Sequence, residues 1–176
     1  MKTIKGYDLM IKVFKANLNN IDFICDLSES LNYKNVFDVE NGVLIRVLDK
    51  NTVENNIDNF LIASVDDEFA GFLWYSWDYP YDMINNTILY EDISDCVYSE
   101  QIGVSREYKR CGIGRAFYEY LSALTGKNVL VYVNKEPEGN LASLNFHKSV
   151  GFKVVGIFEA DEFVGIKGFK SYLLKK

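Results

Sequence analysis

The chain reads Lys109-Arg110-Cys111-Gly112-Ile113-Gly114-Arg115 at the point where a predicted strand is followed by a predicted helix. Glycine lets a ligand approach the backbone closely, and the unpaired N–H groups and dipole of a first helical turn attract anions. Residues 106 to 115 hold four Lys or Arg and one Glu, a local net charge of +3. The segment therefore predicts a site for a phosphate or pyrophosphate group.

Two common phosphate motifs do not fit this segment. A Walker A loop needs Gly-Lys-Ser/Thr, whereas Arg115 and Ala116 follow Gly114. A dinucleotide fingerprint needs a third glycine where this chain has Phe117. The alternative that stays open is a glycine-rich turn whose arginines are merely solvated.

The elements around this segment follow from apolar spacing. Strand Cys96–Val104 precedes it, and a helix over 112–125 follows, because apolar residues recur there at i, i+3, i+4, i+7, i+8 and i+11. Gly126 ends this helix, and the apolar run Val129–Val133 predicts a buried central strand. Asn140 is a natural N-cap for a short helix ending near Val150.

The remaining segments are less regular. An antiparallel hairpin is predicted over 60–65 and 69–77, followed by a long acidic connection over 78–95. The other predicted elements are strands over 9–14, 152–158 and 169–174 and helices over 19–31 and 36–48.

Length and composition indicate one globular domain over residues 1–176. The chain has 48% hydrophobic and 25% charged residues, which is not the composition of a disordered protein. Its net charge of −6 argues against nucleic acid as a partner, because phosphates require a surplus of Lys and Arg. The charge is unevenly distributed along the chain. Residues 1–100 carry 7 Lys and Arg against 18 Asp and Glu, whereas residues 101–176 carry 12 Lys and Arg against 7 Asp and Glu. The basic C-terminal block suits an anionic ligand.

Cysteine and histidine usage argues against a metal site. Cys25, Cys96 and Cys111 lack metal-ligand spacing, and His147 is the single histidine. We see neither a signal peptide at the N-terminus nor an apolar run long enough to cross a membrane. We therefore expect no metal, no membrane association and a reducing, cytoplasmic location.

A second motif, later in the chain, is similar to the pattern of a known protein family. Asn140, Ser143, Phe146, Gly151 and Phe152 match the pattern Asn-x-x-Ala/Ser-x-x-Phe-Tyr-x-x-x-Gly-Phe, with His147 in place of the tyrosine. Together with the two glycines of the loop, where Lys109 replaces the usual Gln or Arg, the chain resembles the GNAT superfamily of acyl-CoA-dependent N-acetyltransferases. The resemblance covers about residues 60–158 and implies an α/β (α+β) fold. It implies a mixed, mostly antiparallel sheet of about seven strands with a splayed central pair and about four flanking helices.

The resemblance also implies a cofactor and its contacts. Acetyl-CoA would be the cosubstrate, with its pantetheine arm along the backbone of Ile102, Gly103 and Val104. The expected pyrophosphate contacts are Lys109, Arg110, Cys111, Gly112, Ile113, Gly114 and Arg115, and the later motif adds Asn140, Ser143 and Phe146.

Direct acetyl transfer to an amine needs a base and an acid. An alkyl ammonium group with a pKa of about 10.4 must lose a proton before attack, and Glu100 is placed to take it, two residues before the pantetheine stretch. Some relatives use a glutamate where this chain has Tyr132. His147 replaces the tyrosine that protonates the leaving thiolate in relatives, so it could donate a proton or hold a water there. The alternatives are that Glu100 only ends a strand or pairs with Arg106, and that His147 is structural.

Trp74, Tyr75 and Trp77 are the candidate acceptor-binding residues. Aromatic walls and the acidic residues of 82–95 would suit a cationic amine, whereas core packing and solvated charge are the alternative. The sequence thus predicts acetyl transfer to a primary amine of a small molecule or peptide. A non-catalytic CoA-binding sensor and a protein N-terminal acetyltransferase are the alternatives, and the resemblance leaves a homodimer open.

Overall fold

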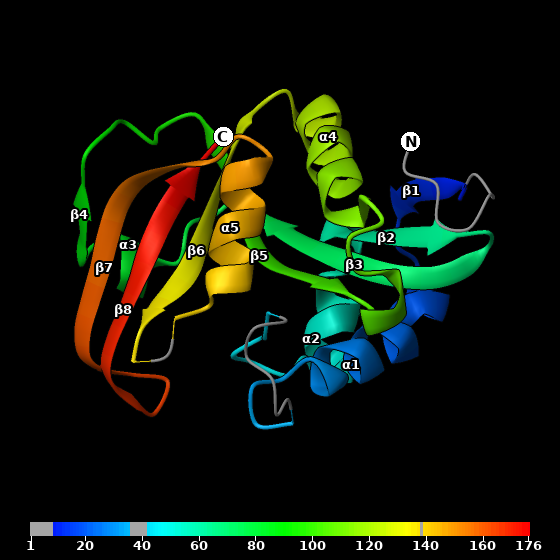
Figure 1. The fold of residues 1–176 in the computed structure, drawn as a ribbon, viewed down its shortest axis with the longest axis horizontal. Coiled ribbons are helices and arrows are strands. Elements are labelled where there is room, and N and C mark those ends of the chain that lie inside the picture. Colours follow the sequence, from blue (N-terminus) through cyan, green and yellow to red (C-terminus); the bar gives the residue numbers. More distant parts are fainter. Residues whose placement is uncertain (1–8, 36–41, 138) are drawn as a thin grey trace. The chain divides into compact units, whose positions relative to one another are not determined.

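A computed structural model describes residues 9–35, 42–137 and 139–176 (Figure 1). The described residues form two compact units. The first takes in residues up to 35, 44–75 and 101–125, and the second takes in 42–43, 76–100, 126–137 and 139–176. Strand β5 (Cys96–Val104) belongs to both, because its first five residues lie in the second unit and its last four in the first. The prediction of one domain stays a prediction.

The first unit contains the N-terminal antiparallel strands. Strand β2 (Phe60–Val65) pairs with β1 (Ile11–Lys15) on one side and with β3 (Glu68–Ser76) on the other. Every residue of β2 is buried, including Ser64, as expected for a mostly apolar strand that is paired on both sides. Helices α1 (Ile21–Ser30), α2 (Lys50–Asn55) and α4 (Ile113–Thr125) complete the unit.

Two glycines show which helix covers which face of this unit. A Cβ added to Gly71 of β3 would lie within 3.5 Å of Ile113 and Phe117, which belong to α4. A Cβ on Gly103 of β5 would instead meet Phe72 and Leu31, next to the end of α1. Helix α4 therefore packs on one face of β3 and β5, and the α1 region packs on the other.

The second unit is dominated by a long antiparallel hairpin. Strands β7 (Lys153–Phe163) and β8 (Ile166–Lys175) pair along almost their whole length, β6 (Asn128–Glu136) pairs with β8, and β4 (Thr87–Leu89) pairs with β7. The first half of β5 runs parallel to β6. Helices α3 (Tyr81–Ile84) and α5 (Leu141–Ser149) also belong to this unit, as Figure 1 shows.

The predicted fold class is confirmed. The hydrogen-bonded strand order is β1-β2-β3-β5-β6-β8-β7-β4, a mixed and mostly antiparallel sheet with the parallel β5–β6 pair near its centre. Over the described residues there are eight strands and five α-helices, one more of each than the predicted numbers. None of the described helices has the length and apolar character needed to span a membrane.

Two segment predictions need correction. The helix predicted over 36–48 is absent from 42–48, and the rest of that prediction lies outside the described residues. The Asn32 side chain donates to the carbonyls of Leu44 and Ile45, and the Leu48 N–H donates to the Ser28 hydroxyl, so this stretch bonds to other segments rather than to itself. The connection predicted over 78–95 contains α3 and β4.

Candidate functional site

The loop before α4 is tied to β3 by two hydrogen bonds. The Ser105 N–H donates to the Ala70 carbonyl at 2.8 Å, and the Tyr108 hydroxyl donates to the Glu68 carboxylate at 2.6 Å. The bond to Glu68 raises the pKa of Tyr108 to about 12, so the phenol keeps its proton at neutral pH. The loop is therefore held at both ends of its short 3₁₀ turn, Arg106–Tyr108.

The backbone of the loop leaves donors exposed. Arg110 has a φ of 65° and Gly112 a φ of 99°, a region that favours glycine and is uncommon for other residues. The N–H of Ala116 bonds to the Gly112 carbonyl at 3.0 Å. Among the described residues, the amides of 113–115 find no backbone acceptor, as the start of a helix requires. These three N–H groups are available to an anion.

A cavity of about 480 Å³ lies beside this loop, within the first unit. Its lining consists of Leu9, Ile11, Arg110, Cys111, Gly112, Arg115, Ala116 and Glu119. Both arginines are exposed, and every ion pair found among the described residues uses a lysine instead. The structure thus brings four of the predicted pyrophosphate-binding residues to one cavity that carries two cations and one carboxylate.

The end of β5 holds the predicted base and pantetheine stretch. Glu100, Ile102 and Val104 are half-buried, and Gly103 is buried. A Cβ at Gly103 would lie 2.8 Å from the Phe72 ring, so the backbone and the ring approach as closely as glycine allows. Since strand residues alternate in direction, Glu100 and Gly103 point to opposite faces.

Residues of the later motif form the N-cap of helix α5 and the turn that follows its last residue. The helix lies beside β6 in Figure 1. The Asn140 side-chain oxygen accepts from the Ser143 N–H at 3.1 Å, and its nitrogen donates to the Val43 carbonyl at 3.0 Å. Both ends of the amide are therefore used inside the protein, as expected for an N-cap. Phe146 is half-buried, and Gly151, with a φ of 102°, follows the end of the helix.

His147 is almost completely buried, with 1% of its surface exposed. Its Nδ1 lies 2.7 Å from the Ser143 carbonyl, which can only accept, so Nδ1 carries the proton. Burial lowers the pKa of His147 to about 4, and the ring is neutral at pH 7. It packs edge-on against Phe146 and Phe152. The acid role of His147 stays a prediction, and the neutral ring favours the version in which it holds a water.

The three predicted acceptor residues do not share one surface. Trp74 stacks on Phe60, with ring centroids 5.4 Å apart, on the face covered by α1 and α2. Tyr75 points to the opposite face, where its hydroxyl donates to the Asp58 carbonyl at 3.4 Å and burial raises its pKa. Trp77 is 55% exposed and belongs to the second unit. Their role in acceptor binding stays a prediction.

Tyr132, at the position where some relatives use a glutamate, forms a hydrogen bond within the second unit. The Thr87 hydroxyl donates to the Met83 carbonyl at 2.8 Å, so at its 2.6 Å contact with Tyr132 it accepts, and Tyr132 donates. Burial raises the pKa of Tyr132, which keeps this proton in place.

Gln101 is a residue that sequence reasoning missed. Its side-chain nitrogen donates to the Arg46 carbonyl at 3.0 Å, while its oxygen is buried and has no hydrogen-bond partner among the described residues. The alternation of side chains along β5 could have pointed to it. Gln101 lies on the same face of the strand as Gly103, which belongs to the predicted pantetheine stretch.

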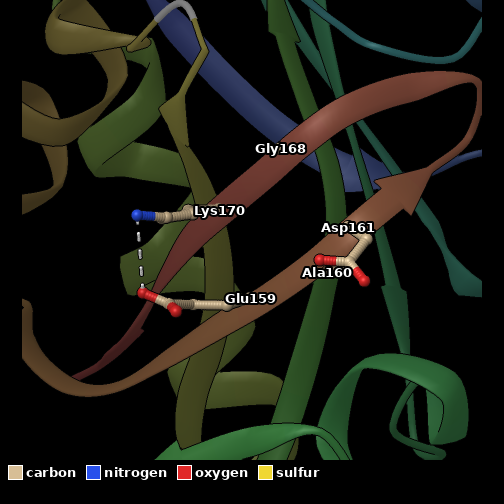
Figure 2. Close-up of a pocket in the computed structure, with 5 residues that line it drawn as sticks. All are labelled: Glu159, Ala160, Asp161, Gly168 and Lys170. Carbon is tan, nitrogen blue, oxygen red and sulfur yellow. Dashed lines mark ion pairs between the residues drawn. The ribbon is translucent and has the colours of Figure 1, made fainter.

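A shallow hollow on the β7–β8 hairpin carries none of the predicted residues. Figure 2 shows Lys170 reaching toward Glu159, with Asp161 further along β7. Lys170 also pairs with Glu136 at 3.0 Å, so its one positive charge is shared by two carboxylates. No group of histidine, cysteine or acidic residues able to hold a metal ion is found in the described part of the chain.

Comparisons with known proteins show the family and the fold of the chain. A model of the acetyltransferase (GNAT) family matches residues 25–152. Solved structures with the same fold include smu.2055 from Streptococcus mutans UA159, with a TM-score of 0.68 and 21% identity, covering 94% of this chain and 98% of that one. The ribosomal-protein-S18-alanine N-acetyltransferase of Escherichia coli gives 0.63 at 13% identity, covering 94% and 92%. The PaiA N-acetyltransferase of Thermoplasma acidophilum, solved with coenzyme A, gives 0.58 at 16%, covering 95% and 98%.

A search of curated protein sequences finds no match. The family match nevertheless spans most of the chain and both motifs. The chain belongs to the GNAT acetyltransferase family.

Proposed function

We propose that the protein transfers the acetyl group of acetyl-CoA to a primary amine on a small molecule or a peptide. The observation that carries this proposal is the anion site at 109–115. Three N–H groups without backbone acceptors, two arginines without carboxylate partners and a cavity of about 480 Å³ lie together there. A pyrophosphate needs both directed donors and cationic charge, and this segment offers both.

The residues present suit acetyl-CoA, which supplies the thioester whose acetyl group moves to the amine. Arg110 and Arg115 would hold its phosphates together with the amides of the first turn of α4. The backbone of 102–104 would hold the pantetheine arm. The glycines at 103 and 112 support this assignment, because side chains there would meet the Phe72 ring or strain the backbone.

Glu100 is the proposed base. A half-buried carboxylate in the middle of β5, two residues before the pantetheine stretch, can take the proton of an ammonium group before attack. The substitution Glu100→Gln keeps the size and hydrogen-bonding capacity of the side chain but removes its basicity.

His147 is proposed to hold a water at its Nε2 on the thiolate side of the reaction. The Nδ1 proton is donated to the Ser143 carbonyl, so Nε2 carries a lone pair that accepts from water. That water, and not the ring, would then donate a proton to the thiolate and regain one from the nitrogen of the acceptor, which loses its second proton as the amide forms. Wild-type turnover by His147→Phe, which keeps an aromatic ring but has no nitrogen, would show that this role is not needed.

The acceptor is proposed to be a primary amine drawn by the acidic N-terminal block, with Trp74 as a candidate contact, because Tyr75 points to the opposite face of β3 and bonds to Asp58. Charge polarity along the chain supports a cationic acceptor and an anionic cosubstrate. The cytoplasm is the proposed location, supported by the absence of a disulfide among Cys25, Cys96 and Cys111. Neither nucleic acid nor membrane is proposed as a partner, and a homodimer is compatible with these features.

Thiol release in the presence of an amine panel tests the enzyme against the sensor alternative. The panel should hold alkyl amines, polyamines and peptides with free N-termini. Calorimetric titration with CoA, run on the same preparation, reports cofactor binding separately. Binding of CoA without thiol release above the uncatalysed rate for any amine would favour a CoA sensor, and peptide-only turnover would favour N-terminal acetylation.

A further inference from the structure

A side-chain hydrogen bond joins the loop before α4 to the β2–β3 hairpin. Glu68 is the first residue of β3, directly after the turn of the hairpin, and Tyr108 is the last residue of the 3₁₀ turn in the loop. The Tyr108 hydroxyl donates to the Glu68 carboxylate at 2.6 Å, although 40 positions separate the two residues in the chain. Both residues belong to the first unit, so the bond lies within one compact part of the molecule.

The backbone that follows Tyr108 has an unfavourable conformation. Arg110 has a φ of 65°, which costs free energy in a residue with a side chain, and Gly112 follows with a φ of 99°. Left-handed residues in a turn are a usual component of backbone anion sites. A conformation of this kind persists where the surrounding contacts enforce it. The contacts of the loop therefore decide how well its amides are placed for a ligand.

Tyr108 connects the hairpin to this strained backbone. Its N–H donates to the Ser105 carbonyl at 3.0 Å, and its carbonyl accepts from the Cys111 N–H at 3.4 Å. The second bond encloses the left-handed residue Arg110, so a shift of Tyr108 would be passed on to the amides at the start of α4. Because this second bond is long, it holds the loop weakly. The short bond to Glu68 is the stronger restraint on the position of Tyr108.

A phenol suits this connection because it is neutral. The bond to Glu68 raises the pKa of Tyr108 to about 12, so the phenol stays protonated and remains a donor at neutral pH. A lysine or arginine bonded to Glu68 would have its positive charge paired with a carboxylate. With tyrosine in this place the loop is held without using a cation, and Arg110 and Arg115 stay outside the ion pairs found among the described residues.

We propose that Tyr108 and Glu68 are positioning residues for the cofactor, because their bond holds the loop in the conformation that presents its amides to a pyrophosphate before the ligand binds. The inference rests on the proposed binding of acetyl-CoA at 109–115. Preorganisation raises affinity, since the ligand then does not have to order the loop. The competing interpretation is that the bond stabilises the fold and has no effect on the ligand.

Calorimetric titration with CoA tests the two residues. Tyr108→Phe removes the hydroxyl and Glu68→Ala removes the acceptor, and each should raise the Kd about fivefold, the factor expected for one lost hydrogen bond. The double variant should bind no more weakly than either single variant, because both substitutions remove the same bond. Glu68→Gln keeps an acceptor oxygen and should restore most of the affinity.

Asp67→Asn is the matched control. It removes a carboxylate from the same turn, where Asp67 pairs with Lys12 of β1 at 2.7 Å, and it should leave the Kd for CoA unchanged. In turnover, Tyr108→Phe should raise the KM for acetyl-CoA and leave kcat and the KM for the amine unchanged. A purely structural role would lower the unfolding temperature and leave the Kd at the wild-type value. A wild-type Kd for Tyr108→Phe, or an equal loss of affinity for Asp67→Asn, would overturn the proposal.

Inorganic pyrophosphate separates this proposal from the proposed function. It needs the same amides and arginines as the cofactor, but neither the thioester nor the amine. If the variants weaken pyrophosphate binding in the same order in a protein that shows no thiol release, the positioning role stands and the transferase is rejected. If the wild type binds neither CoA nor pyrophosphate, both proposals are rejected.

Discussion

The segments 100–115 and 140–152 carry the two family motifs, yet their residues are used differently. In the first, three amides and the side chains of Arg110 and Arg115 have no partner in the hydrogen-bond and ion-pair networks of the described residues. In the second, both ends of Asn140 and the Nδ1 of His147 bond to the protein itself. The first segment therefore leaves donors and positive charge that the proposed cofactor site needs, whereas the second uses its polar groups to cap and pack helix α5.

The largest effect is expected at Glu100, in the segment prepared for a ligand. Glu100→Gln should lower kcat/KM about a hundredfold near neutral pH, within the usual range for a general base, and leave the unfolding temperature unchanged. Glu107→Gln is the matched control, since it removes the same charge from an exposed site in the same segment. Rates measured from pH 6 to 10 should rise again for Glu100→Gln as the amine loses its own proton. A flat, wild-type profile would assign Glu100 to strand structure alone.

The next effect is on cofactor affinity. Replacing Arg110 and Arg115 together by glutamine should weaken CoA binding at least tenfold, because two charge-assisted contacts to phosphate are lost. Calorimetry at low and high salt measures it, and the difference from wild type should shrink as salt screens the charges. Arg106→Gln lies outside the cavity lining and tests whether charge alone matters. An equal loss for Arg106→Gln would show that the cavity is not the specific site.

The self-bonded segment predicts a stability effect of pH. His147 has a pKa of about 4 when folded against about 6.5 when unfolded, so below pH 6.5 the unfolded chain binds the extra proton and is favoured. Folding stability should therefore fall by about 2 kcal/mol between pH 7 and pH 5 on account of this one group. Denaturant titrations at several pH values measure it. The free energy of unfolding should fall more steeply with decreasing pH for wild type than for His147→Phe. Parallel pH curves for the two proteins would mean that folding does not lower the pKa of the ring.

The elements near the site were predictable because their apolar periods are long. The strand over 96–104 was predicted with the bounds it has, and the helix over 112–125 begins one residue later in the structure. Helix α3 and strand β4 were not predicted because four and three residues carry too little periodicity, and β4 depends on its partner β7. The helix predicted over 36–48 is wrong in its described part, 42–48, because Leu44 and Leu48 bond to the end of α1 and to Ser28.

The site itself was predictable only where one segment supplies it. The loop motif predicts Arg110 to Arg115 as phosphate contacts from neighbouring residues alone, and this role stays a prediction. Gln101 was missed because its partner, the Arg46 carbonyl, lies 55 positions earlier in the chain, and only folding brings the two together. His147 was given a chemical role from its motif position, whereas its burial comes from Phe146 and Phe152 packing around it.

The smallest expected effect separates capping from cofactor binding at Asn140. Asn140→Ala removes the acceptor for the Ser143 N–H, and loss of an N-cap lowers folding stability by about 1 kcal/mol. If Asn140 is only a cap, CoA affinity measured well below the unfolding temperature should stay at the wild-type level. Asn140→Asp keeps the capping oxygen and serves as the control, although it loses the donor to the Val43 carbonyl. If the alanine variant instead lost CoA affinity while the aspartate variant kept it, the second segment would also contact the ligand. Both segments would then take part in cofactor binding.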